Sequence, residues 1–145
     1  MTKRITISTL DAMKSSGDKF VMITAYDATF ARLASEAGAE TILVGDSLGM
    51  VLQGHETTIP VSLDAMVYHT ECVARAKPRS LIVADLPFMS FSNSDDALHA
   101  STQLMQAVAQ MLKLEGGTWL SDSINRLVER GVPVCAHLGL TPQSV

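Results

Sequence analysis

The stretch TILVGDSLGMV, residues 41–51, joins an apolar strand to a polar ending. Its first four residues form an uninterrupted, partly β-branched run, which is typical of a strand covered on both faces of a parallel sheet. The run then ends in Gly45, Asp46 and Ser47. A carboxylate inside an apolar environment is costly unless a positive partner meets it, so the position of Asp46 requires an explanation.

The same apolar pattern recurs along the chain and alternates with helical segments. One helix is capped by Asp27 and stopped by Gly38, and Ser94, Asp95 and Asp96 provide the cap and first-turn charges of another. A long glycine-bearing loop covers 49–60. The expected strands are 20–26, 41–46, 80–85, 110–115 and 132–137. The helices expected after the one capped by Asp27 are 62–77, 94–108 and 119–130. This alternation predicts an α/β fold with a parallel sheet.

Two architectures compete for such a sheet. An open doubly wound sheet can be completed by five strands, whereas a (β/α)₈ barrel needs about 250 residues. The chain has 145 residues, so length alone favours the open sheet and a single domain over residues 1–145.

Composition excludes several classes of function. Apolar residues make up 47% of the chain and charged residues 18%, so we expect a packed core rather than disorder. The net charge of −4 and the lack of a Lys/Arg run argue against nucleic acid as a partner. The longest apolar runs fall far short of the ~20 residues that cross a bilayer, so no membrane association is expected.

The cysteines indicate a reducing compartment. Cys72 and Cys135 show no CxxC spacing, and no secretory leader precedes them. We expect two buried free thiols in a cytoplasmic protein.

Polar side chains gather at the ends of the expected strands. Parallel α/β folds assemble their ligand sites at the carboxyl ends of the strands, so side chains placed there converge on one rim. The residues at or beside these ends are Asp27, Asp46 with Ser47, Asp85, Lys113 with Glu115, and His137.

This rim carries more negative than positive charge. Lys113 alone cannot balance three carboxylates, which are Asp46, Asp85 and Glu115. Lys113 and Glu115 are two residues apart in a strand and therefore point to the same face. Oxygen ligands without a Cys/His cluster suit Mg²⁺, and the same oxygens accept Mn²⁺. The sequence therefore predicts a divalent metal site at the rim.

Each residue also has a structural explanation. Asp27 fits a helix cap, and Lys113 with Glu115 fits a partly buried salt bridge. A lone histidine such as His137 is more often a satisfied core residue. The chain has no GxGxxG or GxxxxGK[ST] cradle for nucleotides and no GxSxG elbow that would support Ser47 as a nucleophile.

Five segments together resemble the ketopantoate hydroxymethyltransferase family. They are TAYD (24–27), VGDSLGMVLQGHETTIPV (44–61), ADLPFMS (84–90), KLEGG (113–117) and PVCAHLGLTPQSV (133–145). The resemblance runs from about Ile5 to Val145. It implies a (β/α)₈ barrel of the phosphoenolpyruvate/pyruvate type, of which this chain supplies about the first five strands, in place of the open sheet.

The resemblance also implies roles for the strand-end residues. Asp46, Asp85 and Glu115 are the implied metal residues, with Asp46 and Asp85 also meeting the substrate through the metal. Ser47 and Lys113 are implied to bind the substrate carboxylate, and His137 to face the reacting part of the substrate. A homo-oligomer is implied as the assembly.

The implied reaction transfers a hydroxymethyl group from 5,10-methylenetetrahydrofolate to 3-methyl-2-oxobutanoate and gives 2-dehydropantoate, the first step of pantothenate biosynthesis. It proceeds through an enolate stabilised by Mg²⁺. The general-base Glu of the family is expected beyond Val145, so the chain is interpreted as a fragment or a truncated product without normal turnover. The alternatives are another Mg²⁺-dependent keto-acid lyase or mutase of the same barrel type, and an inactive half-barrel with a structural role.

Overall fold

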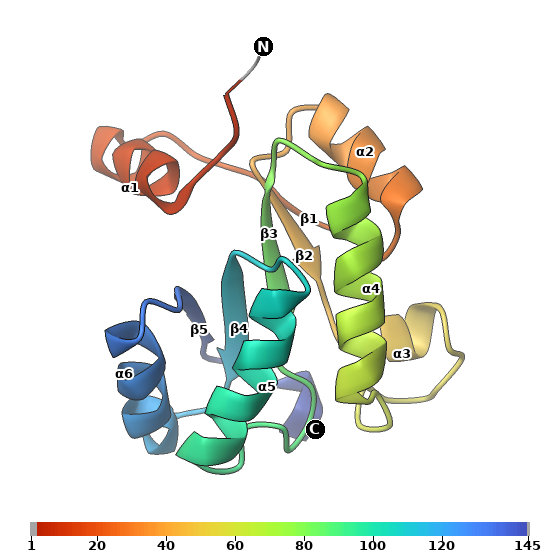
Figure 1. Ribbon diagram of the computed structural model, residues 1–145, viewed down its shortest axis with the longest axis vertical. Coiled ribbons are helices and arrows are strands. Elements are labelled where there is room, and N and C mark those ends of the chain that lie inside the picture. Colours follow the sequence, from red (N-terminus) through yellow and green to blue (C-terminus); the bar gives the residue numbers. More distant parts are fainter. Residues whose placement is uncertain (1–2, 145) are drawn as a thin grey trace.

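The computed structural model describes residues 3–144 and contains one five-stranded sheet (Figure 1). All neighbouring strands are parallel, and their order in space is their order in the sequence. A doubly wound sheet reverses its strand order at a switch point, and this sheet does not. The order is therefore that of a barrel. The strands are β1 (Met22–Thr24), β2 (Thr41–Val44), β3 (Leu81–Asp85), β4 (Met111–Glu115) and β5 (Val134–His137).

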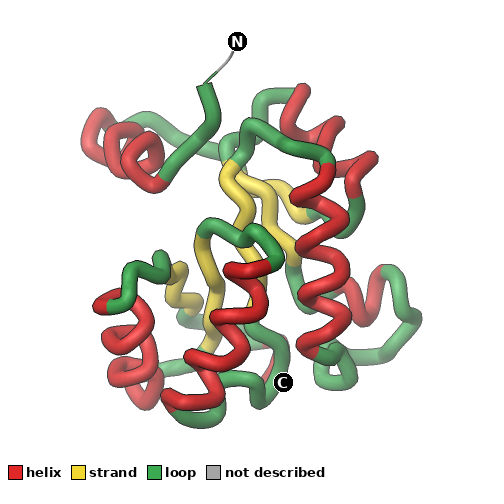
Figure 2. The backbone as a smooth tube through the Cα atoms, in the orientation of Figure 1, coloured by secondary structure: helices red, strands yellow, loops and turns green. Residues whose placement is uncertain are grey.

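Helices follow the strands as the sequence predicts. Figures 1 and 2 show α2, α4, α5 and α6 side by side along one face of the sheet. The bounds are α1 (Ile7–Ser16), α2 (Ala28–Glu36), α3 (Leu48–Val51), α4 (Leu63–Arg75), α5 (Ser94–Gln106) and α6 (Ser121–Glu129), with 3₁₀ turns η1 (Thr118–Leu120) and η2 (Pro142–Ser144). Within residues 3–144, none of these helices combines the length and apolar character that a membrane span requires.

The core lies on both faces of β3, because alternate residues of a strand point in opposite directions. Ile82 and Ala84 pack in the main cluster under the helices. Leu81 and Val83 point the other way and pack against Ile5 and other residues of the N-terminal segment. Every residue of β3 is buried, which accounts for its unbroken apolar run.

Several local expectations are corrected by the structure. The N-terminal segment, to which the sequence patterns assigned no element, forms α1, which begins with a reciprocal Thr6–Thr9 capping box. The expected loop at 49–60 begins inside the short helix α3. The cap of α5 is Asn93 instead of Ser94, because its side chain accepts hydrogen bonds from the backbone N–H groups of Asp95 and Asp96, both at 3.0 Å.

Two further expectations concern single residues. The Oδ1 atom of Asp27 accepts hydrogen bonds from the backbone N–H groups of Thr29 and Phe30, at 2.7 and 2.9 Å, so its role as a helix cap is confirmed. Cys72 and Cys135 are free, as expected, but both are only partly buried. The expectation of fully buried thiols was wrong.

We predict that Ile82→Ala lowers the free energy of unfolding by about 2–5 kcal/mol, because Ile82 is fully buried in the central strand and its truncation leaves a cavity. Urea unfolding followed by circular dichroism measures the change. The matched control is Val128→Ala on the exposed side of α6, where the expected change is within about 0.5 kcal/mol. Equal losses in the two variants would contradict the assignment of the core.

Candidate active site

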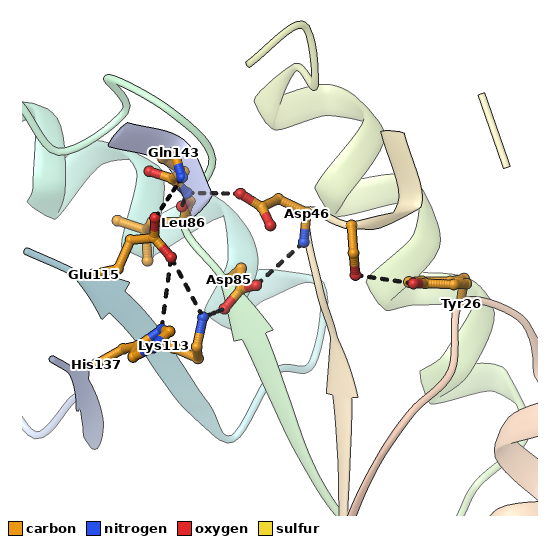
Figure 3. A network of polar contacts seen from close by, with 9 residues as sticks. Tyr26, Asp46, Asp85, Leu86, Lys113, Glu115, His137 and Gln143 are labelled. Atoms are coloured by element: carbon orange, nitrogen blue, oxygen red, sulfur yellow. Dashed lines mark hydrogen bonds and ion pairs between the residues drawn. The ribbon is translucent and has the colours of Figure 1, made fainter. Parts of the chain in front are cut away.

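The strand register brings the predicted residues to one end of the sheet. Asp85 is the last residue of β3 and lies opposite Lys113 of β4, while Glu115 lies opposite His137 of β5. Asp46 follows β2 by two residues. Figure 3 shows Asp46, Asp85, Lys113, Glu115 and His137 facing a common centre. We call these five residues the acidic cluster.

Lys113 forms the middle of the acidic cluster. Its Nζ atom lies 2.8 Å from Asp85 Oδ1 and 4.0 Å from Glu115 Oε2. The side chains of Asp85 and Glu115 are only 5% and 4% exposed, whereas that of Lys113 is 16% exposed. One ammonium therefore serves two deeply buried carboxylates, and its exposed fraction leaves it open to a ligand.

Burial is the largest influence on the pKa of Asp85. Removal from water raises the pKa of this carboxyl to about 6, even though the adjacent Lys113 ammonium opposes the rise. The neighbouring charge of Asp46 contributes further in the upward direction. A group in this state gains from an additional cation, because a cation stabilises the ionised form that burial disfavours.

Asp46 is fixed by two hydrogen bonds. Its backbone N–H donates to Asp85 Oδ2 at 3.2 Å, and its Oδ2 accepts from Gln143 Nε2 at 2.7 Å. Gly45 makes this approach possible, because a Cβ at that position would lie 2.9 Å from Ser47 Oγ and 3.4 Å from Asp85 Oδ2. A larger residue in the turn after β2 would therefore displace the Ser47 hydroxyl.

Gln143 is a site residue that sequence reasoning missed. It lies in η2 and is 5% exposed. Its backbone N–H donates to Glu115 Oε1 at 2.7 Å, in addition to its bond to Asp46. No spacing rule links a glutamine to an aspartate 97 residues earlier, and the only signal is its place inside the segment TPQSV.

Ser47 stands apart from the acidic cluster. Its hydroxyl is hydrogen-bonded to the phenol of Tyr26 at 2.9 Å, and Tyr26 also fixes His69 through its backbone carbonyl, 2.8 Å from Nδ1. Tyr26 is a second site residue that the sequence does not distinguish, although it lies in the segment TAYD. The structure thus brings five of the six predicted residues into one network and places Ser47 beside it.

His137 closes the cluster on the side of β5. Its Nδ1 lies 3.6 Å from Glu115 Oε2 and has no hydrogen-bond partner among the described residues. The side chain is 31% exposed, so the ring is not a satisfied core histidine. It remains available to a bound molecule.

The donor set fits a magnesium ion held by few protein ligands. Within residues 3–144, no group of three or more His, Cys, Asp or Glu side chains lies close enough together to coordinate one metal ion. Mg²⁺ commonly uses only one or two carboxylates and completes its octahedron with water and substrate oxygens. Asp46 and Asp85, on adjacent strands and linked by a hydrogen bond, meet that requirement. Glu115 is connected to them through Lys113 and Gln143.

A pocket of about 180 Å³ opens beside the acidic cluster. The rings of Phe91 and Trp119 lie nearly parallel, with an interplanar angle of 11° and centroids 6.1 Å apart. Gly116 lets the Trp119 ring come close, because a Cβ there would lie 2.9 Å from that ring. The lining residues are Phe88, Met89, Phe91, Ser92, Glu115, Trp119, Gln143 and Ser144.

The raised pKa of Asp85 predicts a pH dependence of stability. A carboxyl whose pKa is higher in the folded than in the unfolded chain stabilises the fold fully below its ordinary value of 3.8. That contribution is lost as the pH rises through about 6. In the wild type, we therefore expect the free energy of unfolding to fall by on the order of 3 kcal/mol between pH 4 and about pH 7. In Asp85→Asn this decrease should be absent, because the side chain does not ionise.

Urea denaturation at several pH values, in the presence of EDTA, measures this difference. The control is Asp11→Asn, which changes an exposed aspartate of α1 and should keep the wild-type pH profile. Wild-type and Asp85→Asn profiles of the same shape would refute the raised pKa.

Solved structures share the fold of this chain. Crystal structures of 2,3-dimethylmalate lyase, a member of the PEP mutase/isocitrate lyase superfamily, superpose with a TM-score of 0.66 at 17% identity, over 89% of this chain and 51% of that chain. A phosphonopyruvate hydrolase complex with oxalate and Mg²⁺ gives 0.64 at 21% identity, over 76% and 38%. These similarities confirm that the chain has the fold of part of a (β/α)₈ barrel.

Curated relatives are much closer in sequence. The 3-methyl-2-oxobutanoate hydroxymethyltransferases of Burkholderia multivorans and Marinobacter nauticus are each 60% identical over 141 residues, which is 97% of this chain. That of Shewanella sediminis is 58% identical over 142 residues. The chain spans about half the length of these relatives, from 52% to 54%. The model of the ketopantoate hydroxymethyltransferase family matches residues 4–145, and the chain belongs to this family.

Proposed function

We propose that this chain forms the metal- and keto-acid-binding part of an enzyme that transfers a hydroxymethyl group from 5,10-methylenetetrahydrofolate to 3-methyl-2-oxobutanoate. The product is 2-dehydropantoate, and the reaction is the first step of pantothenate biosynthesis. The observation that carries the proposal is the acidic cluster, in which buried carboxylates outnumber the one ammonium at the carboxyl ends of the strands. The 60% identity to enzymes named for this reaction favours it over another lyase or mutase.

Asp46 and Asp85 would hold Mg²⁺, or Mn²⁺, with Glu115 as the third metal residue. Bound there, the ion supplies Lewis-acid polarisation of a 2-oxo group. The oxygen donors support a hard cation. The raised pKa of Asp85 also fits, because a bound cation would stabilise the ionised form of this buried carboxyl. The phosphonopyruvate hydrolase of the same fold was solved with oxalate and Mg²⁺, which supports this pairing of ion and acid.

Three other residues would bind and orient the keto acid. The partly exposed ammonium of Lys113 offsets the substrate carboxylate, and the Ser47 hydroxyl donates to it while Tyr26 fixes that hydroxyl. His137 presents its partly exposed ring to the reacting end, while its buried Nδ1 faces Glu115. We assign the general base to no residue of this chain, because each carboxylate of the cluster is already engaged by Lys113, Gln143 or a backbone N–H.

The aromatic pocket offers a place for the folate co-substrate. The one-carbon unit has to reach the bound keto acid, so its carrier must bind next to the acidic cluster, and this pocket shares Glu115 with it. Trp119 is 60% exposed and presents a flat apolar face that suits a pteridine ring, and the buried ring of Phe91 stacks against it. We therefore place the pteridine ring in this pocket.

Assembly and location complete the proposal. We propose a homo-oligomer, the assembly implied by membership of the ketopantoate hydroxymethyltransferase family. Free cysteines and a biosynthetic reaction support the cytoplasm.

Metal-dependent substrate binding is the direct test of the proposed function. In calorimetric titrations of this chain with 3-methyl-2-oxobutanoate, we expect binding in the presence of Mg²⁺ and none in EDTA. Asp46→Asn removes one anionic ligand and should abolish the Mg²⁺-dependent heat. Asp64→Asn, at an exposed position of α4, is the control and should bind like the wild type. Equal binding of 3-methyl-2-oxobutanoate with Mg²⁺ and with EDTA would overturn the assignment of a metal-dependent site.

The folate pocket predicts a fluorescence signal, because Trp119 is the single tryptophan of the chain. Tetrahydrofolate should quench its emission saturably. Phe91→Leu should weaken the affinity about 2- to 10-fold by removing one aromatic wall. The control is Phe20→Leu on the strand-edge side, with free N-acetyltryptophanamide correcting for absorption by the ligand. Unchanged affinity in Phe91→Leu would place the pteridine elsewhere.

A further inference from the structure

Gln143 joins three neighbouring strands at the acidic cluster. Its Nε2 donates to Asp46 Oδ2 after β2, at 2.7 Å, and to the carbonyl oxygen of Leu86 after β3, at 3.0 Å. Its backbone N–H donates to Glu115 Oε1 in β4, at 2.7 Å. Three hydrogen bonds from a residue that is 5% exposed make a rigid bridge across the site, which Figure 3 shows from close by.

The acceptors fix the direction in which the amide points. Asp46 Oδ2 and the Leu86 carbonyl oxygen accept hydrogen bonds only, so the group between them has to be the NH₂ end of the amide. A flipped amide would place its oxygen against two other oxygens. The carbonyl oxygen of Leu86, a residue outside the acidic cluster, therefore helps to hold the Gln143 NH₂ group toward Asp46.

This contact makes the two oxygens of Asp46 unequal. Oδ2 is occupied by the short bond from Gln143, whereas Oδ1 has no protein donor within the described residues. The backbone of Asp46 is also tied to Asp85. The carboxylate therefore has a fixed orientation, with one oxygen engaged by Gln143 and the other without a protein donor among the described residues.

We propose that Gln143 is a positioning residue that restricts Asp46 to one-oxygen ligation and thereby selects the metal. This inference rests on the proposed function, in which Asp46 is a metal ligand. Mg²⁺ and Mn²⁺ accept compact octahedral sites with single carboxylate oxygens, whereas Ca²⁺ takes 6–8 oxygens and often binds both oxygens of a carboxylate. The hydrogen bond to Oδ2 competes with ligation through both oxygens and so disfavours the larger ion.

Gln143→Met tests the inference, because it keeps the length and the backbone N–H of the residue and removes only the amide donors. Calorimetric titrations with Mn²⁺ and, separately, with Ca²⁺ give the ratio of the two affinities. We expect Mn²⁺ binding to weaken about tenfold, the usual cost of losing a partner that orients a ligand, and Ca²⁺ binding to be unchanged or tighter. The Mn²⁺/Ca²⁺ preference should thus fall about tenfold or more.

The controls separate this inference from the proposed function. Gln106→Met, at an exposed position at the end of α5, should keep both affinities. A wild-type chain that binds no Mn²⁺ would overturn the proposed function itself. If the wild type binds Mn²⁺, an unchanged ratio in Gln143→Met overturns the selection by Gln143. Tighter binding of both ions would overturn it too, because Gln143 would then compete with the metal instead of positioning its ligand.

Circular dichroism melting verifies that Gln143→Met is folded. If that variant does not fold, Gln143→Asn replaces it, since it keeps an amide on a stem one methylene shorter and breaks the bond to Asp46 by distance alone. The same fall in the Mn²⁺/Ca²⁺ ratio is expected, and a wild-type ratio in Gln143→Asn would overturn the inference.

Discussion

The ammonium of Lys113 lies between two carboxylates that are almost fully withdrawn from water, and the rest of the site is arranged around this shortage of positive charge. Burying an ion without a partner costs several kcal/mol, so each carboxylate needs donors from the surrounding chain. Asp85 obtains them from Lys113 and the backbone of Asp46, and Glu115 from Gln143. The raised pKa of Asp85 shows that these donors leave part of the cost unmet.

The parallel sheet is what allows such a cluster to exist. Adjacent parallel strands end at the same edge, so residues far apart in the sequence become neighbours without any special loop. Asp85 pairs with Lys113 and Glu115 pairs with His137 by register alone. Glycines complete the arrangement where side chains would collide, at Gly45 beside Asp85 and at Gly116 beside Trp119. The backbone thus supplies positions, and the side chains supply the chemistry.

Rigidity and access are divided between different parts of the site. Asp46, Asp85, Glu115 and Gln143 are buried and mutually hydrogen-bonded, which suits residues that must hold a fixed geometry. Lys113 and His137 are partly exposed, which suits residues that meet incoming molecules, and the aromatic pocket opens beside Glu115 and Gln143. The proposed binding of a keto acid and of a folate uses this division, since the two ligands would approach from the accessible side.

Much of this protein was predictable from local patterns. The five strands, the helices that follow them and the strand-end residues Asp46, Asp85, Lys113, Glu115 and His137 were all indicated by apolar runs and by the residues that interrupt them. The helix α1 was missed because its cap, Thr6 with Thr9, carries no acidic residue of the usual capping pattern. The cap of α5 was misplaced by one residue because Asn93 and Ser94 are both good caps, and only backbone geometry distinguishes them.

The sequence by itself determined the secondary structure and the chemistry available at the strand ends, because apolar periodicity and side-chain type are local properties. Local patterns left a barrel and an open sheet both possible, and only the family resemblance predicted the barrel, because strand order is a property of the tertiary structure. The role of Gln143 was likewise decided by the tertiary structure. That residue reaches Asp46 across 97 positions because the chain after β5 folds back over β3 and β4. Hydrogen bonds between distant segments depend on their packing in space, which no local pattern encodes.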